Sequence, residues 1–208
     1  MSTLVLVRHA QATPFEKITD QLSKLGEEQS TLLGEYWRAR GVAFDEVYSG
    51  SFLRHVRTAE LAGFSGFESN DAFNEYSADR ILRALPDFAP PSDNRHLQGM
   101  LDRAMPQWIA GTLQAPGLES FGEFRGRVTG ALRRILEADR PSRRVAVFTS
   151  AGPIGVAVQT ALKAPEGMAI EINWRIRNCS LTEFVFTRGR VSLDSFNATP
   201  HLSEVTFR

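Results

Sequence analysis

The sequence predicts an α/β fold: a three-layer sandwich with a mainly parallel sheet, an antiparallel edge strand and a helical insertion over the carboxyl ends of the strands. Three observations predict it. Uninterrupted apolar runs are typical of strands covered on both faces, helical stripes alternate with these runs, and a proline-broken stretch at 86–91 precedes two more helical patterns. The 208 residues suffice for one large core, so we expect a single domain over 1–208, with 76–125 as a variable helical cap.

The strands are expected at short apolar segments. In chain order they are residues 4–7, 44–48, 145–149, 180–186 and 191–196. The first and third are continuous apolar runs, and the last two flank Arg188 and Gly189, which indicates a terminal hairpin.

The helices are expected between these strands. In chain order they are residues 22–40, 51–63, 95–113, 119–138 and 152–162. The first carries an apolar stripe that stops at Gly41, Ser51 can cap the second, and the Gly152-Pro153 pair starts the last. Because ligands bind outside the carboxyl ends of parallel strands, Arg8, His9, Ser49 and Ser150 are expected at one edge of the sheet.

Composition excludes several classes of partner. Lys+Arg and Asp+Glu are equal at 24 each, which argues against a nucleic-acid or acidic-membrane partner. The single cysteine, Cys179, excludes an internal disulfide framework and fits a reducing compartment. The opening apolar run is too short for a signal or membrane segment, so we expect a cytoplasmic protein.

Two cationic side chains follow the first predicted strand. The Arg8 guanidinium is a planar fork of donors that suits phosphate or carboxylate. A neighbouring cation disfavours protonation of His9, which keeps a ring nitrogen available as nucleophile or base. A solvated strand end can carry the same dipeptide, so the pair alone does not define a site.

A second candidate is the segment YSGSFLRHVRTAE, residues 48–60. A strand ends at Ser49, and the helix that follows places Arg54 in its first turn, close to the same edge. His55 and Arg57 are expected to point elsewhere on the helix. Taken alone, this segment also fits a charged helix surface.

Together these pieces resemble the histidine phosphatase superfamily, the phosphoglycerate mutase-like proteins. The resemblance spans the chain in order through six stretches: LVRHAQ, LSKLGEEQ, SGSFLRHVRTAE, FNE at 73–75, LESFGEFRGRV and NATPHL. The third matches the family's Ser-Ser-x-Leu-x-Arg-Ala-x-x-Thr-Ala element. The match fades after Glu75, where YSADRILRALPDF stands.

The resemblance implies a role for four residues. His9 would attack phosphorus and become a phosphohistidine, while Arg8 and Arg54 would hold the equatorial oxygens. Glu75 would protonate the leaving alkoxide and then activate water. The implied partner is a phosphorylated small molecule or phosphoprotein. No metal-ligand spacing and no P-loop is present, so we expect no cofactor.

The pattern breaks in VAVFTSAGPIGVAV, residues 145–158. The family's second catalytic histidine aligns with Ser150, and no histidine occurs between His96 and His201. A serine donates one neutral hydrogen bond, and loss of an oxyanion-site donor costs on the order of 10²–10³ in rate. A water in the space beside Ser150, or His55 turned in from the next helix, could restore part of that loss. We therefore expect the site, with Ser150, to bind phosphate and the protein to have reduced turnover. If the space beside Ser150 is vacant, Ser150→His, alone or with Ala151→Gly, should restore activity.

Three alternatives stay open. The chain could be a non-catalytic phosphate-ligand-binding homologue or, less favoured, a phosphoglycerate-type mutase. A serine hydrolase built on Ser150, Asp194 and His201 is disfavoured, because Phe148 stands where a nucleophile elbow needs a small residue. Neither the substrate nor the oligomeric state follows from the sequence.

Overall fold

A six-stranded sheet organises the chain in the computed structural model, which describes residues 1–13, 20–138, 140 and 142–207. The strands are β1 (Ser2–Arg8), β2 (Glu46–Ser49), β3 (Glu68–Ser69), β4 (Arg144–Thr149), β5 (Leu181–Thr187) and β6 (Arg190–Ala198), in the spatial order β3-β2-β4-β1-β5-β6. Neighbours from β3 to β1 are parallel, whereas β5 is antiparallel to both β1 and β6. The predicted α/β fold with a mainly parallel sheet and an antiparallel edge is confirmed.

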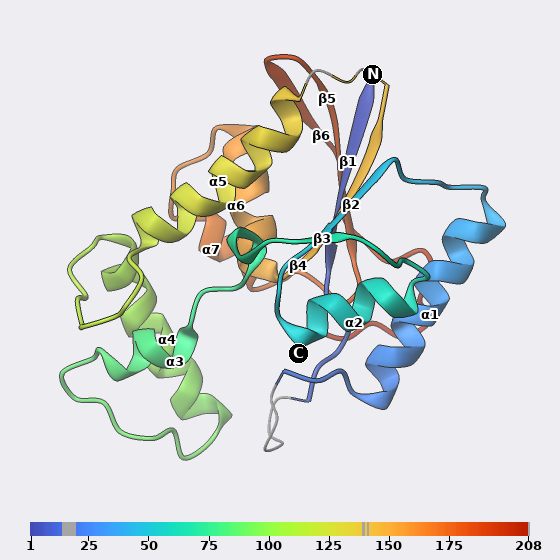
Figure 1. The fold of residues 1–208 in the computed structure, drawn as a ribbon. Helices are drawn as coiled ribbons and strands as arrows, with labels where there is room; N and C mark the ends of the chain where they lie inside the picture. The colour runs from blue at the N-terminus through green and yellow to red at the C-terminus, as the bar shows by residue number, and fades with distance from the viewer. Residues whose placement is uncertain (14–19, 139, 141, 208) are drawn as a thin grey trace.

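Helices cover both faces of the sheet (Figure 1). They are α1 (Lys24–Ala39), α2 (Leu53–Leu61), α3 (Ala78–Arg83), α4 (Asn94–Ile109), α5 (Phe121–Glu137), α6 (Ala151–Leu162) and α7 (Met168–Asn173), with a 3₁₀ turn η1 at Asp71–Phe73. Helices α1 and α2 lie on one side, and α5, α6 and α7 on the other. Among the described helices, none is long and apolar enough to cross a membrane.

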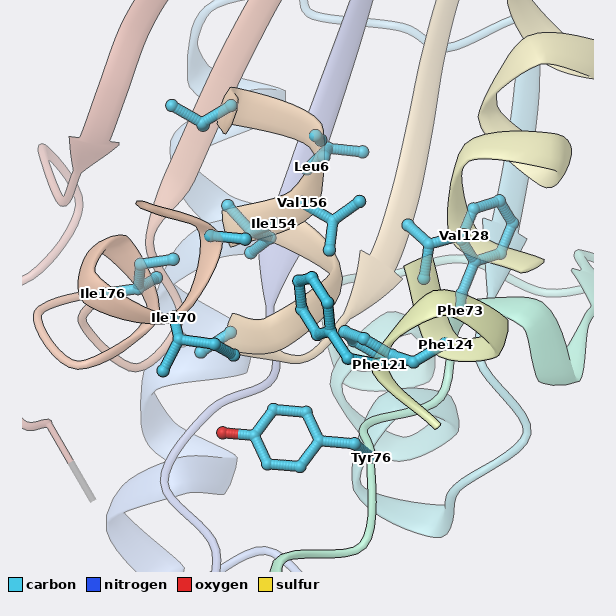
Figure 2. Close-up of a cluster of buried hydrophobic side chains, with 14 of the residues drawn as sticks. Leu6, Phe73, Tyr76, Phe121, Phe124, Val128, Ile154, Val156, Ile170 and Ile176 are labelled. Atoms are coloured by element: carbon cyan, nitrogen blue, oxygen red, sulfur yellow. The ribbon is translucent and has the colours of Figure 1, made fainter. Parts of the chain in front are cut away.

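Strand β4 shows why the apolar runs are strands. Its side chains alternate between two clusters: Val145 and Val147 pack under α5 and α6, whereas Ala146 and Phe148 pack under α1 and α2. Figure 2 shows the first cluster, to which α5 contributes Phe124 and Val128 and α6 contributes Ile154 and Val156. Burial on both faces requires apolar residues at successive positions, which is the observed pattern.

The inserted helices share the core of the sheet. Met100, Met105 and Trp108 of α4 belong to the same cluster as Val145 of β4. The insertion packs against α5, whose apolar residues join it to the core that lies on the sheet. In Figure 1, α3 and α4 lie toward the end of the molecule at which β1 finishes.

The start of α2 differs from the prediction. Phe52 is the N-cap residue, because the Ser51 hydroxyl is instead bonded to the Asn74 amide at 2.8 Å. The first helical amide, that of Leu53, donates to Asp20 at 2.8 Å. Asp20 thus stabilises the start of a helix distant from it in sequence.

Candidate active site

The carboxyl ends of three parallel strands meet at the predicted edge. In the strand register, Arg8 pairs with Thr149, and the His9 amide continues the ladder by donating to the Thr149 carbonyl at 2.8 Å. Ser49 pairs with Phe148, after which the Gly50 amide donates to the Phe148 carbonyl at 2.9 Å. The structure therefore brings Arg8, His9, Ser49 and Ser150 to one edge, as predicted.

His9 is buried and held as a single tautomer. Its Nδ1 lies 2.8 Å from the Ala10 carbonyl oxygen, which can only accept, so Nδ1 carries the proton of the neutral ring. Burial lowers the pKa of His9 well below its usual range, and the charges of Arg54 and Arg8 lower it further. The lone pair of Nε2 is therefore available to attack an electrophile.

Arg54 lies beside this ring and shares its charge with a carboxylate. Its guanidinium donates to Asp20 at 2.6 Å and stacks on the Phe52 ring, 4.5 Å from the centroid. Arg57 points outward to Glu60 at 2.6 Å, as predicted. Asp20 was not predicted as a site residue, since nothing in the local pattern links it to α2.

Arg8 is fixed by backbone carbonyls. Its guanidinium donates to the carbonyls of Ile176 and Phe207, the latter at 3.0 Å. Its charge lowers the pKa values of both His9 and Glu75. Arg8 is thus a fixed positive charge within electrostatic reach of both residues.

The side chain of Glu75, which precedes α3 in sequence, lies at the N-terminal end of α6. Its carboxylate accepts from the Gly152 amide at 2.9 Å and from the Tyr76 amide at 3.1 Å. A Cβ at position 152 would fall 2.0 Å from the Glu75 Oε1, so this contact requires glycine. Burial raises the pKa of Glu75 despite the opposing effects of the Gly152 amide and Arg54. The carboxyl is therefore suited to hold and release a proton.

Ser150 does not stand alone. Its hydroxyl lies 2.6 Å from the His55 Nε2, and both side chains are inaccessible to solvent. The His55 ring also lies 5.6 Å, centroid to centroid, from the His9 ring. Burial and the Arg54 charge lower the pKa of His55 well below its usual range.

The sequence profile of the histidine phosphatase superfamily (branch 1) matches residues 4–199. The chain belongs to this superfamily. A search of the curated proteins gives no match.

Solved structures of two phosphatases and of a phosphoglycerate mutase share the fold. A phosphoserine phosphatase mutant (H9A) from Entamoeba histolytica, in complex with phosphoserine, superposes with a TM-score of 0.67 at 19% identity over 97% of this chain and 100% of that one. The mycobacterial glucosyl-3-phosphoglycerate phosphatase with VO3 gives 0.69 at 21% identity over 94% and 98%. A phosphoglycerate mutase from Bacillus anthracis gives 0.70 at 19% identity over 96% and 94%.

The position of His55 in this superfamily member corrects two expectations. The prediction that His55 points away from the site is wrong, because its ring reaches Ser150. The Ser150→His design required a vacant space beside Ser150, and that condition is not met, because the His55 ring fills the space. A signal was available: the family element places alanine after its arginine, where this chain has histidine.

The serine-hydrolase alternative does not fit the structure. The His201 ring packs on Tyr36, with centroids 5.8 Å apart, whereas the hydroxyl of Ser150 is bonded to His55. Asp194 lies on β6, at the antiparallel edge of the sheet. The proposed Ser150–Asp194–His201 triad is therefore not assembled.

Proposed function

We propose that the protein is a phosphate-monoester hydrolase that acts through a phosphohistidine on His9. The observation that carries the proposal is the tautomer of His9: Nδ1 is bound to a carbonyl, and Nε2 keeps its lone pair. The charges of Arg8 and Arg54 both act on His9 and on the protonatable Glu75. A nucleophile, two cations and an acid are the groups that phosphoryl transfer needs.

The first step forms a bond from His9 Nε2 to phosphorus and breaks the ester P–O bond. The leaving oxygen takes the proton of Glu75, which becomes a carboxylate. Arg8 and Arg54 stabilise the charge on the equatorial oxygens as the phosphoryl group moves. Their charges are fixed by protein contacts and need little reorganisation during the reaction.

The second step hydrolyses the intermediate. The Glu75 carboxylate takes a proton from water, whose oxygen attacks phosphorus as the P–N bond breaks. Inorganic phosphate leaves, His9 is again neutral, and Glu75 is again protonated. No step requires a metal ion, so the proposed activity is metal-independent.

A cavity of about 330 Å³ borders Glu75 and is the proposed place for the leaving group. Its walls include Arg80 and Trp108 from the inserted helices and Glu119 before α5. We propose that segment 76–125 acts as the cap that selects the phosphorylated small molecule or phosphoprotein.

The experiment is turnover of a generic aryl phosphate with and without a chelator, compared with His9→Ala. We expect activity that is indifferent to the chelator and lost in His9→Ala. Activity that persists in folded His9→Ala, or that needs a divalent metal, would contradict the proposal.

A non-catalytic phosphate-binding role is the alternative, and Ser150 motivates it because a hydroxyl brings no charge. Calorimetric titration with phosphate and vanadate, beside the turnover assay, separates the two: binding without hydrolysis favours this role. A mutase is less favoured, because cap arginines that could clamp a second anion have partners inside the cap. Arg83 pairs with Asp79, and Arg103 with Asp87, each at 2.7 Å.

A further inference from the structure

Ser150 and His55 form a buried pair of side chains within hydrogen-bond distance of each other. The Oγ–Nε2 distance is 2.6 Å, and the exposed fractions are 1% and 0%. The pair lies at the carboxyl end of β4, with the His55 ring 5.6 Å from the proposed nucleophile's ring. Buried polar groups are costly unless bonded, so a pair placed this close to the nucleophile calls for a functional explanation.

The Ser150 side chain does not cap the helix that begins after it, although serine usually does so at this position. Ser150 is the N-cap residue of α6, yet its side chain makes no capping hydrogen bond to the helix. A serine N-cap normally accepts from an amide in the first turn. Here the hydroxyl is bonded to His55, and Glu75 accepts from the Gly152 amide instead.

The surroundings leave space for the His55 ring. A Cβ at Gly50 would fall 2.2 Å from the His55 Nδ1 and 2.8 Å from the Asn74 Oδ1. Any side chain at position 50 would therefore collide with the ring. The His55 Nδ1 is buried and has no hydrogen-bond partner among the described residues, so no contact fixes the proton of the neutral ring there and Nε2 can carry it.

We propose that Ser150 is a catalytic donor to the phosphate and that His55 is the residue that positions and polarises it. The phosphate oxygens only accept, so Ser150 must donate its proton to them. Its oxygen then accepts from the Nε2–H of His55. The inference rests on the proposed function, because it concerns the same phosphoryl transfer.

The test is a double-mutant cycle with Ser150→Ala and His55→Phe. Phenylalanine fills the ring volume without donating a hydrogen bond, and His96→Phe makes the same change at an exposed histidine on α4 as the matched control. If the pair acts as one unit, each single variant loses about 10²-fold in kcat/KM and the double variant loses little more. His96→Phe should equal the parent.

The His55→Gln variant distinguishes a hydrogen-bond-donating role of His55 from a purely structural one. A glutamine amide can donate to Ser150 but cannot titrate, so it should recover most of the activity lost in His55→Phe. Kcat/KM unchanged in Ser150→Ala, or losses that multiply in the double variant, would overturn the inference. So would a His55→Gln variant that is folded and no more active than His55→Phe.

If His55→Phe does not fold, the parent protein still supplies a test. Histidine ring ¹⁵N resonances are followed while vanadate is added to the parent and to Ser150→Ala. We expect the His55 signals to shift in the parent and to move much less in Ser150→Ala. Equal shifts in both proteins would overturn the inference.

Failure of the proposed function gives a different result. If the parent shows no His9-dependent turnover, the hydrolase proposal falls, and the pair is judged by calorimetric phosphate affinity alone. Ser150→Ala should then bind phosphate about tenfold more weakly. Unchanged affinity in Ser150→Ala, or a parent that binds no phosphate, would overturn the donor role as well.

Discussion

Moving the buried imidazole from position 55 to position 150 tests the most specific feature of the site. Ser150→His alone places a second imidazole where the His55 ring already lies, 2.6 Å from the present hydroxyl. His55 is fully buried and has no solvent-facing side to which it could move. Overpacking of this kind costs about 1–3 kcal/mol, which lowers the melting temperature of a domain of this size by roughly 2–12 °C. We expect the single variant to be destabilised and no more active than the parent.

The double variant His55→Ala with Ser150→His removes the collision. Alanine at position 55 frees about the volume that histidine at position 150 needs, and the imidazole can then face the phosphate directly. We expect the double variant to melt above Ser150→His and to recover the activity that the single changes lose. The turnover rate of the double variant is compared with that of His55→Ala alone, because one transition-state donor contributes on the order of 10²–10³ in rate.

The assays are thermal unfolding and steady-state turnover of an aryl phosphate, with His55→Ala as the control for the cavity. A Ser150→His variant as stable as the parent would show that the His55 ring moves aside at little cost. That result would contradict the expectation based on its burial. A double variant less stable than the sum of the two single changes would refute the shared-volume argument.

The remaining predictions concern the acid, its support and the nucleophile. Glu75→Gln should lower kcat by about 10²–10⁴ for alkyl phosphates and much less for aryl phosphates, whose leaving groups need no proton; equal losses would count against an acid role. Gly152→Ala, whose methyl meets Glu75, should lower kcat similarly in a folded protein. Because burial lowers the pKa of His9, kcat/KM should persist below pH 6.5 and fall as pH rises through the elevated pKa of Glu75. Asp20→Ala should lower unfolding free energy by about 0.5–2 kcal/mol, since the Leu53 amide loses its acceptor; an unchanged denaturant midpoint would refute this.

The sheet and the positions of Arg8 and Arg54 were predictable because they follow from local rules. Apolar runs mark strands buried on both faces, and parallel strands bring their carboxyl ends together. The short elements β3, α3 and α7 were missed because two to six residues show no measurable period.

The contact between His55 and Ser150 was not predictable from periodicity. Helical periodicity predicts that consecutive residues of the first turn of α2 point in different directions, which places Arg54 in the site and His55 elsewhere. In the structure α2 begins at Leu53, and its first turn faces both β4 and the sheet edge, so successive residues can both enter. The missing histidine at position 150 indicates that His55 could turn in as a substitute, and the histidine at position 55, where the family element has alanine, supports the link between the two positions.

The arrangement of donors favours hydrolysis over binding alone. Phosphoryl transfer spreads charge over three equatorial oxygens, and the proposed site offers one donor group for each: Arg8, Arg54 and Ser150. Arg54 already shares its charge with Asp20 at 2.6 Å, so a third donor matters more. Glu75 distinguishes the two roles. An ionised carboxyl would repel a phosphate dianion, whereas a protonated one can donate a hydrogen bond to it. A carboxyl whose pKa is raised by burial can also give its proton to a leaving oxygen and later take one from water, and these proton transfers are steps of the proposed catalysis rather than of binding.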